Sequence, residues 1–209
     1  YHRKDLGIDE QSFIFGSFNN IYKISSIEFK IWMKLLINVE NSVLILLVDN
    51  KITKINLLNE INKFNIDYTR VKFLDFINNE DHLSRHKIID LYLDTFNYNG
   101  HTSSVDALYA GIPVLTKIGK SFAARVCASI LNSCDMSELI TKDHSHYYDL
   151  AIKISKNKNI LNELKFKLNN NLLNKPLFNT KKYVQNLEKG YSIAYNNKKN
   201  NKDYANIIV

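Results

Sequence analysis

The segment Gly100–Ser104 (GHTSS) has the composition of an anion-binding loop. It lies between an apolar run that ends at Asp94 and a stretch of helical character that begins at Ser103. Its backbone N–H groups and hydroxyls would therefore surround a helix N-terminus, where free N–H groups and the positive end of the helix dipole attract anions. Gly100 lets the backbone approach a ligand closely. The spacing predicts an anion site.

Asp106 follows this loop within the first turn of the same predicted helix. A carboxylate suits the positive end of the helix dipole, and it could also accept a hydrogen bond from a ribose hydroxyl. The plainer alternative is that Thr102 or Ser103 only caps the helix. The sequence contains neither a GxGxxG fingerprint nor a Gly-x4-Gly-Lys-[Ser/Thr] loop, so it does not support a dinucleotide-binding or P-loop site.

Further polar residues follow other predicted strands. Lys23 closes the segment Asn19–Lys23, and a lysine there can stabilise charge on a departing phosphate, although most lysines in so Lys-rich a chain are solvated. His82 and Arg85 are one helical turn apart and could hold a base and a ribose; the alternatives are helix capping and a surface cation. Asp94 ends a buried strand, where it either accepts hydrogen bonds from loop amides or acts as a catalytic base.

Apolar runs of strand character alternate with stretches of helical periodicity. The predicted strands are Ser12–Phe18, Ser42–Val48, Arg70–Phe76, Leu91–Asp94 and Pro113–Thr116. The predicted helices are one that begins at Ser25, then Lys54–Phe64, His82–Ile89, Ser103–Ala110, Ala123–Leu131, His144–Lys156, Ile160–Asn171 and Thr180–Asn196. Ser25 and Glu28 have the spacing of a capping box, and Asp81 is the expected N-cap of the helix at His82.

This alternation predicts an α/β fold, a Rossmann-like open parallel sheet with helices on both faces. Ser42–Val48 is nearly all apolar, as a strand covered on both faces must be. No linker or internal repeat divides the sequence, so residues 1–209 are expected to form a single domain with a helical C-terminal end. In such sheets ligands bind beyond the carboxyl ends of the strands, which is where the polar segments lie.

The composition excludes several kinds of partner. The net charge of +7 comes from lysine more than arginine, and the nearest basic run, Asn196–Lys202, lies at the tail without interleaved aromatics, so we expect no nucleic-acid partner. The longest apolar run, Val43–Val48, is too short to span a bilayer, so we expect no membrane partner. The chain begins at Tyr1 rather than Met, and we expect it to be a portion of a longer protein.

The cysteines and histidines show no metal-ligand pattern. Cys127 and Cys134 are spaced as Cys-x6-Cys with no nearby His pair, which is not a zinc signature. Reduced, partly buried thiols are expected instead, and these indicate the cytosol or nucleus. Four histidines outside the predicted site also lack ligand spacing: His2, His86, His144 and His146.

Three stretches are similar to motifs of one known family. Phe18–Ile24 (FNNIYKI) is similar to the motif Phe-Asn-Gln-Leu-Tyr-Lys-Ile. Leu93–Pro113 is similar to the motifs Leu-Asp-Thr, Asn-Gly-His-Thr-Thr and Asp-x-Leu-Trp-Ala-Gly-x-Pro, in that order. Pro176–Lys181 resembles the segment that opens the final helix of the family. Together these stretches resemble the C-terminal catalytic subdomain of the O-GlcNAc transferase family, and the likeness covers nearly the whole chain.

The resemblance implies the C-terminal half of a two-domain GT-B glycosyltransferase, the half that holds UDP-GlcNAc. The enzyme would add β-linked GlcNAc to Ser or Thr of proteins in the cytoplasm and nucleus, with inversion and without a required metal or other cofactor. The family's first catalytic subdomain and its tetratricopeptide repeats are missing from the sequence. Acceptor proteins would therefore be recognised by those missing parts, and the isolated chain is expected to be inactive.

The resemblance also assigns roles to matching positions. Lys23 would neutralise the diphosphate leaving group and is the expected catalytic residue. The expected donor-binding residues are Asn20, Leu47, Ile77, Asn79, His82, Arg85, Gly100, His101, Thr102, Ser103 and Asp106. Among them, the backbone of Ile77 and the side chain of Arg85 would flank the uracil, with Leu47 packed nearby.

The remaining roles concern the other parts of the nucleotide. By the same resemblance, His101, Thr102 and Ser103 would hold the phosphates. Asp106 would bind the ribose, and His82 the nucleoside.

Two positions depart from the family pattern, and one related branch is an alternative. Asn20 stands where Gln is usual and Asn79 where Lys is usual, and both changes could weaken donor binding. The SPINDLY-type O-fucosyltransferases share the fold but use GDP-fucose, and their loop resembles Ala-Gly-Thr-Thr-Thr with Glu in place of Asp. Gly100–Thr102 and Asp106 favour the GlcNAc branch. A non-catalytic nucleotide-sugar-binding module is a further alternative.

Overall fold

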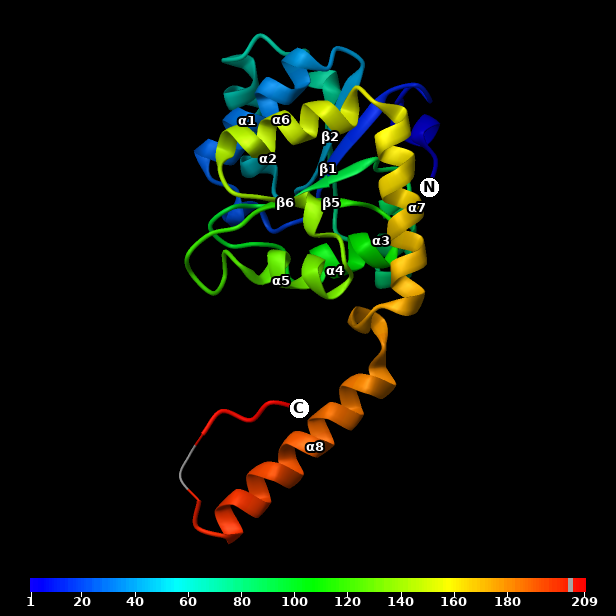
Figure 1. Ribbon diagram of the computed structural model, residues 1–209. Coiled ribbons are helices and arrows are strands. Elements are labelled where there is room, and N and C mark those ends of the chain that lie inside the picture. Colours follow the sequence, from blue (N-terminus) through cyan, green and yellow to red (C-terminus); the bar gives the residue numbers. More distant parts are fainter. Residues whose placement is uncertain (203–204) are drawn as a thin grey trace.

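The computed structural model describes residues 1–202 and 205–209 (Figure 1). Within them one sheet has the strand order β3-β2-β1-β4-β5-β6, and every neighbouring pair is parallel. The strands are β1 (Phe13–Ser17), β2 (Ser42–Leu47), β3 (Val71–Leu74), β4 (Leu91–Leu93), β5 (Val114–Lys117) and β6 (Ile140–Thr141). The five predicted strands are confirmed. β6 was not predicted, because two residues are too few to show a periodicity.

Helices cover both faces of this sheet. The α-helices among the described residues are α1 (Ser26–Asn38), α2 (Lys51–Asn62), α3 (Asn79–His86), α4 (Thr102–Tyr109), α5 (Val126–Ser133), α6 (His144–Ser155), α7 (Lys158–Asn174) and α8 (Thr180–Lys199). Figure 1 shows α1, α2 and α6 on one side of the strands and α3, α4 and α5 on the other. Every residue of β2 is buried, as its apolar sequence requires. The predicted Rossmann-like α/β fold is confirmed.

The order of the strands creates a switch point between β1 and β4. These two strands are neighbours, but the chain passes from β1 to α1 on one face and from β4 to α4 on the other (Figure 1). Open α/β sheets bind ligands at the carboxyl ends of the strands at such a point. The polar segments predicted from sequence after β1 and β4 therefore meet at one edge of the sheet.

Helix α1 begins as predicted, with Ser25 as its N-cap and Glu28 completing the capping box. Glu28 is fully buried. Its carboxylate accepts hydrogen bonds from the N–H of Ser25 at 3.1 Å, from the Ser25 hydroxyl, and from the N–H of Phe96 at 2.8 Å. Phe96 belongs to the loop after β4. The capping carboxylate thus also ties that loop to α1.

Helix α3 begins three residues before the predicted start. Its N-cap is Asn78, whose side chain accepts a hydrogen bond from the N–H of Asp81 at 3.0 Å. The prediction of Asp81 as the cap was wrong, because Asn78 is an equally good cap and leaves Asp81 in the first turn, where a carboxylate is also favourable.

The core continues up to the rim of the switch point. Trp32 and Tyr147 are fully buried; the indole N–H donates to the Tyr147 hydroxyl at 3.4 Å, and that hydroxyl donates to the backbone oxygen of Asp94 at 3.3 Å. Cys127 and Cys134 are free thiols with no exposed surface, so the expectation of partial burial was wrong. Both pack in the apolar core that includes α5. Tightly packed side chains therefore support a large part of the rim of the switch point.

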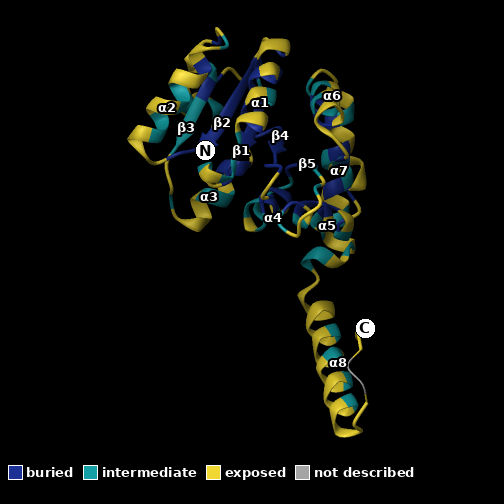
Figure 2. Ribbon diagram, turned by 90° about the vertical axis from the view of Figure 1, so that its left-hand side faces the viewer, coloured by how far each residue is buried: buried dark blue, intermediate teal, exposed yellow. Residues whose placement is uncertain are grey.

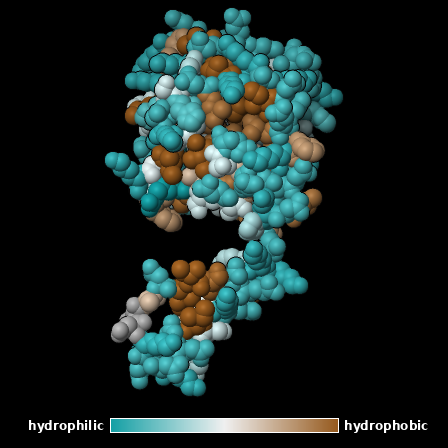
Figure 3. Space-filling view, in the orientation of Figure 1, coloured by the Kyte–Doolittle hydropathy of each residue, from teal (hydrophilic) through white to brown (hydrophobic). Residues whose placement is uncertain are grey.

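Helix α8 projects away from the sheet and its helices, and it contains no buried residue (Figures 1 and 2). Apolar side chains of α8 and of the C-terminal residues gather in one place, which Figure 3 shows as a hydrophobic patch. The pocket there, of about 400 Å³, is lined by Tyr183, Asn186, Leu187, Gly190, Tyr191, Ala194, Ile207 and Val209.

Among the helices of the described residues, none combines the length and the apolar character that crossing a membrane requires.

Replacing Glu28 by Ala should lower the free energy of unfolding by about 2–4 kcal/mol, because α1 loses its cap and the N–H of Phe96 loses its acceptor. Urea unfolding would measure the change. Glu60→Ala is the control, since Glu60 is exposed and forms a surface ion pair with Lys63, the C-cap of α2; it should cost less than about 0.5 kcal/mol. Equally small losses in both variants would contradict the double role of Glu28.

Candidate functional site

The carboxylate of Asp94 lies at the carboxyl end of β4 and is fully buried. Its oxygens accept hydrogen bonds from the N–H of Gly100 at 2.5 Å, the side-chain amide of Asn19 at 3.2 Å and the hydroxyl of Thr116 at 2.6 Å. Burial raises the pKa of this carboxyl to about 6, and the bonds from Thr116 and Gly100 oppose the rise. Of the two roles that the sequence left open, the structure supports the one that holds loop amides.

Asn19 joins the loop after β1 to the first turn of α4. Besides its bond to Asp94, its amide donates to the Thr95 hydroxyl at 3.2 Å, and its side-chain oxygen accepts from the Ser103 hydroxyl at 2.5 Å. A serine hydroxyl has a single proton, so while it donates to Asn19 it cannot also donate to an anion. Ser103 can then offer a phosphate only its backbone N–H.

Helix α4 begins at Thr102, and its N-cap is His101. The His101 side chain makes no capping hydrogen bond, and neither Thr102 nor Ser103 occupies the cap position. The alternative that one of these hydroxyls merely caps the helix is therefore wrong. Since the side chain of the N-cap accepts no hydrogen bond from the first turn, the N–H groups of that turn remain donors for an anion.

Gly100 occupies a position that has no room for a side chain. A Cβ atom there would lie 2.7 Å from the Ser103 hydroxyl oxygen and closer still to that of Ser104. The glycine N–H is bound by Asp94. Gly100 is thus required by the packing of the first turn of α4, in addition to any approach of a ligand.

Lys23 ends the short 3-10 helix η2 (Ile21–Lys23) and is partly buried. Its ammonium donates to the carbonyl of Asn99 at 3.1 Å and lies 4.0 Å from the centre of the Tyr98 ring. Burial lowers the pKa of Lys23, and the negative charge of Asp94 opposes that change. Lys23 is therefore a fixed cation beside the loop, and the alternative of a solvated lysine is wrong.

The His101 ring faces the same region. Its Nε2 atom is buried and has no hydrogen-bond partner in the part of the chain that the structure describes. Burial lowers the pKa of His101, and the charge of Lys23 lowers it further. The ring is therefore neutral at pH 7, and its Nε2 atom has no hydrogen-bond partner among the described residues.

Asp106 lies in the second turn of α4, not in the first as predicted. The helix dipole acts mainly within the first turn, so the expected stabilisation of this carboxylate by the dipole was wrong. Asp106 is half-buried, and burial raises the pKa of its carboxyl. Its contact with a ribose stays a prediction.

His82 and Arg85 form one unit on α3. Arg85 is almost wholly buried, so the alternative of a surface cation is wrong. Its guanidinium donates to the carbonyl of Asp75 at 2.7 Å and to Nδ1 of His82, from Nε at 3.0 Å and from Nη2 at 2.6 Å. It also lies 4.9 Å from the centre of the Phe18 ring. Because Nδ1 accepts, the proton of the neutral His82 ring is on Nε2, which can donate to a ligand.

Four other predicted donor-binding residues have no side-chain hydrogen bond to Lys23 or to residues 100–103 among the described residues. Asn20 is the exposed N-cap of η2, and Asn79 is the exposed first residue of α3. Leu47 ends β2 and is buried, whereas Ile77 is half-buried in the loop before α3. None of the four side chains is hydrogen-bonded to Lys23 or to residues 100–103 among the described residues. Their contacts with the donor stay predictions.

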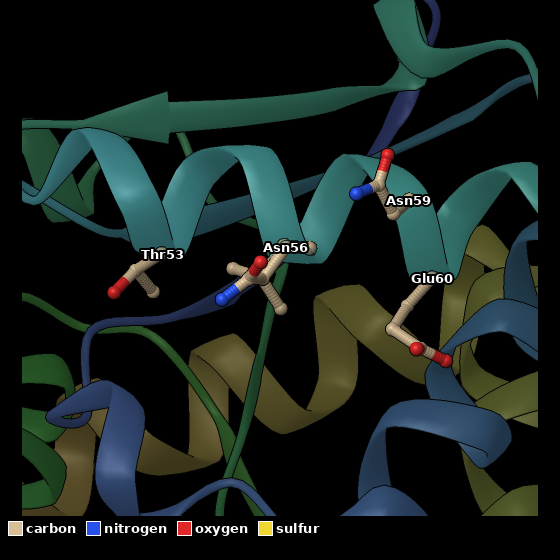
Figure 4. A pocket seen from close by; sticks show the side chains of 5 residues that line it. Thr53, Asn56, Asn59 and Glu60 are labelled. Carbon is tan, nitrogen blue, oxygen red and sulfur yellow. The ribbon is translucent and has the colours of Figure 1, made fainter.

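A separate pocket of about 310 Å³ lies along α2 (Figure 4). It is lined by Thr53, Asn56, Leu57, Asn59 and Glu60, all from one helix. This lining presents a carboxylate and no cation, which does not suit a diphosphate. We therefore place the candidate site at the switch point and not at this pocket.

The comparison with known families decides which family the chain comes from. A model of the family described as Glycosyl transferase family 41 matches residues 1–187. The chain belongs to glycosyl transferase family 41. The resemblance found in the motifs around Lys23 and Gly100 is thereby confirmed.

Curated relatives of this family 41 chain carry two names. The probable UDP-N-acetylglucosamine–peptide N-acetylglucosaminyltransferase SPINDLY of Eustoma exaltatum subsp. russellianum is 32% identical over 181 residues. The probable UDP-N-acetylglucosamine–peptide N-acetylglucosaminyltransferase SEC of Arabidopsis thaliana is 31% identical over 195 residues. The two alignments cover 85% and 93% of this chain but 20% of each relative. The chain thus spans about a fifth of the length of the curated relatives it matches.

A solved structure supports the same relationship. A mutant of Thermobaculum terrenum O-GlcNAc transferase superimposes with a TM-score of 0.74 at 27% sequence identity. The match covers 80% of this chain and 33% of that one. The family 41 chain therefore corresponds in fold to one part of a larger enzyme.

Sequence reasoning did not assign Asn19, Tyr98 and Asn99 to the site of this family 41 chain. A signal for Asn19 was present, because an amide directly after one buried strand can satisfy the carboxylate that ends the next. Asn99 opens the stretch that is similar to the motif Asn-Gly-His-Thr-Thr, but no signal in the sequence gave Tyr98 or Asn99 a contact with Lys23. Their contacts with Lys23 depend on how the loops after β1 and β4 meet in space.

His86 lies one turn beyond His82 on α3 and is fully buried. Its Nδ1 lies 2.7 Å from the carbonyl oxygen of His82 and so carries the proton, while its Nε2 has no hydrogen-bond partner among the described residues. Burial is the main reason that the pKa of His86 is lowered to about 4; the hydrogen bond to the His82 carbonyl opposes the change, and nearby His82 and Arg85 contribute to it. The folded chain therefore keeps this ring neutral.

This burial predicts a loss of stability between pH 7 and pH 4. The unfolded chain takes up a proton on His86 near the ordinary pKa of 6.5, and the folded chain does so only near pH 4. The contribution of His86 to the free energy of unfolding is complete above pH 6.5. It falls as the pH is lowered, by about 3 kcal/mol at pH 4. His86→Asn keeps an N–H donor but does not titrate, so its unfolding free energy should fall by less. Urea unfolding at several pH values would measure both proteins, and identical pH profiles would sink the assignment to His86.

Proposed function

We propose that this chain is the UDP-GlcNAc-binding half of a protein O-GlcNAc transferase. The observation that carries the proposal is the placement of two positive features side by side at the switch point. One is the first turn of α4, which its N-cap does not cover, and the other is the Lys23 ammonium on the Asn99 carbonyl. A helix N-terminus suits one phosphate and a fixed cation suits a second. The names of the SPINDLY, SEC and Thermobaculum relatives support GlcNAc as the sugar.

The donor's diphosphate would bind at the first turn of α4. Thr102 offers its N–H and an exposed hydroxyl, Ser103 its N–H, and His101 a ring nitrogen without a partner among the described residues. Gly100 leaves the backbone free of a side chain there. Asp106, one turn further along the helix, would accept a hydrogen bond from the ribose.

The nucleoside would lie beside α3. His82 would donate to it from Nε2, and Arg85 would act through His82 by fixing the orientation of the ring. The backbone of Ile77 would contact the uracil, with Leu47 packed nearby. Asn20 and Asn79 would stand at the edge of the donor, where their shorter or uncharged side chains weaken binding.

The reaction that we propose is an inverting transfer. A Ser or Thr hydroxyl of a protein of the cytoplasm or nucleus attacks the anomeric carbon opposite the diphosphate, which gives β-linked GlcNAc and releases UDP. Negative charge grows on the leaving diphosphate, so Lys23 and the α4 terminus stabilise the transition state more than the bound donor. In this scheme those groups supply the positive charge, and no metal or other cofactor is required. The groups that act on the acceptor lie outside this chain.

The alternative donor is GDP-fucose, as in SPINDLY-type enzymes. Overall identity does not separate the two groups of relatives, because SPINDLY and SEC match at 32% and 31%, and both carry the name of an N-acetylglucosaminyltransferase. The motif Gly100–Thr102 followed by Asp106 favours UDP-GlcNAc. Calorimetric titration with UDP, UDP-GlcNAc, GDP-fucose and an oligonucleotide would test this.

We expect weak binding of UDP and UDP-GlcNAc, no binding of the other two, and no sugar transfer to a peptide by this chain alone. Preference for GDP-fucose would overturn the proposed donor. A full-length protein that binds UDP-GlcNAc but transfers no sugar would indicate a non-catalytic module.

Thr102→Ala should weaken UDP binding about ten- to a hundredfold, since a hydrogen bond to a charged group contributes roughly 1.5–3 kcal/mol. The free energy of unfolding should change by less than about 0.5 kcal/mol, because Thr102 is exposed and does not cap α4. Thr180→Ala is the matched control, an exposed threonine at the first position of α8; it should alter neither quantity. Unchanged UDP affinity in Thr102→Ala would count against the loop as a phosphate site.

A further inference from the structure

We propose that Tyr98 is a positioning residue for Lys23, and that the face of its ring holds the ammonium beside the diphosphate site. The Lys23 nitrogen lies 4.0 Å from the centre of the Tyr98 ring. The same ring contacts His101, with 5.3 Å between the ring centres and 61° between the planes. Tyr98 therefore touches both of the groups that would meet the phosphates. This inference rests on the proposed function of the site.

The backbone that carries the Tyr98 ring is fixed by the loop itself. The Thr95 hydroxyl donates to the carbonyl of Tyr98 at 2.6 Å, and the side chain of Asn99 donates to the carbonyl of Thr95 at 2.6 Å. The N–H of Asn99 donates to the carbonyl of Ala123 at 2.9 Å. These bonds set the place of the Asn99 carbonyl and of the Tyr98 ring at the same time. Lys23 is thus held between two neighbouring groups of one pinned turn.

An aromatic ring suits this task better than a carboxylate. Its face attracts a cation through the quadrupole but brings no net negative charge, so the ammonium stays available to a diphosphate. A carboxylate in the same place would neutralise Lys23 and repel the ligand. The charged and titratable groups that act on Lys23 are Asp94, which is buried and bound by three donors, and His101, which is neutral. The exposed fraction of Tyr98, 41%, leaves part of the ring open toward solvent.

The test compares UDP with uridine, which lacks the phosphates, by NMR titration of this chain and its variants. Tyr98→Leu removes the ring face, and it should weaken UDP binding about three- to thirtyfold with uridine binding unchanged. Tyr98→Phe keeps the ring face and should bind UDP within about twofold of the original chain. Tyr109→Leu is the control, because Tyr109 is an exposed tyrosine that packs on Phe178 at the other end of α4.

Three results would overturn the inference. Equal losses of UDP and uridine affinity in Tyr98→Leu would mean that the ring only supports the loop. Unchanged UDP affinity in Tyr98→Leu would mean that Lys23 does not need the ring. If the original chain binds uridine but gains nothing from the phosphates of UDP, the proposed function fails and this inference fails with it, which separates that failure from the first two.

Discussion

The site depends on one buried carboxylate. Asp94 directly follows β4, and its donors come from three different segments: Asn19 after β1, Gly100 before α4 and Thr116 in β5. A carboxylate without exposed surface is costly unless its oxygens are hydrogen-bonded, so the folded state retains all three donors. The two loops of the switch point are therefore joined by a requirement of folding. These two loops therefore take up their geometry when the chain folds, before any ligand binds.

The charges around Asp94 are arranged in layers. The carboxyl has a pKa of about 6, so it is largely ionised at pH 7 and its charge helps Lys23 to stay protonated despite partial burial. Lys23 stands on the outer side, where the first turn of α4 also offers N–H groups. A negative charge behind and positive groups in front would ordinarily work against anion binding. Here the hydrogen bonds that Asp94 accepts offset much of its negative potential. Lys23 and the N–H groups of the first turn of α4 can therefore still attract an anion.

Much of the fold could be predicted from sequence, because it depends on local patterns. The apolar run in β2 and the capping box of Ser25 and Glu28 are signals carried by a few neighbouring residues. The errors concern features that only tertiary contacts decide. Two residues near α3 could cap it, and packing selected Asn78. The sequence left a surface cation open as an alternative for Arg85, because its acceptors, the carbonyl of Asp75 and the ring of His82, meet only in the folded chain.

The candidate site shows the same contrast between what local sequence patterns predict and what only tertiary contacts decide. From its composition Gly100–Ser104 could be predicted as an anion-binding loop or as a helix cap, but the sequence could not say which donors stay free. The structure shows that the Ser103 hydroxyl is bound by Asn19 and that no hydroxyl caps α4, so backbone N–H groups and Thr102 are left to meet an anion. A site of fixed N–H groups and one oriented lysine needs little rearrangement when charge develops on a leaving diphosphate. On the proposed function, the leaving-group side of the reaction is therefore built by contacts within this one sheet. On that proposal, a chain that spans about a fifth of its relatives' length would carry the groups that stabilise the leaving diphosphate.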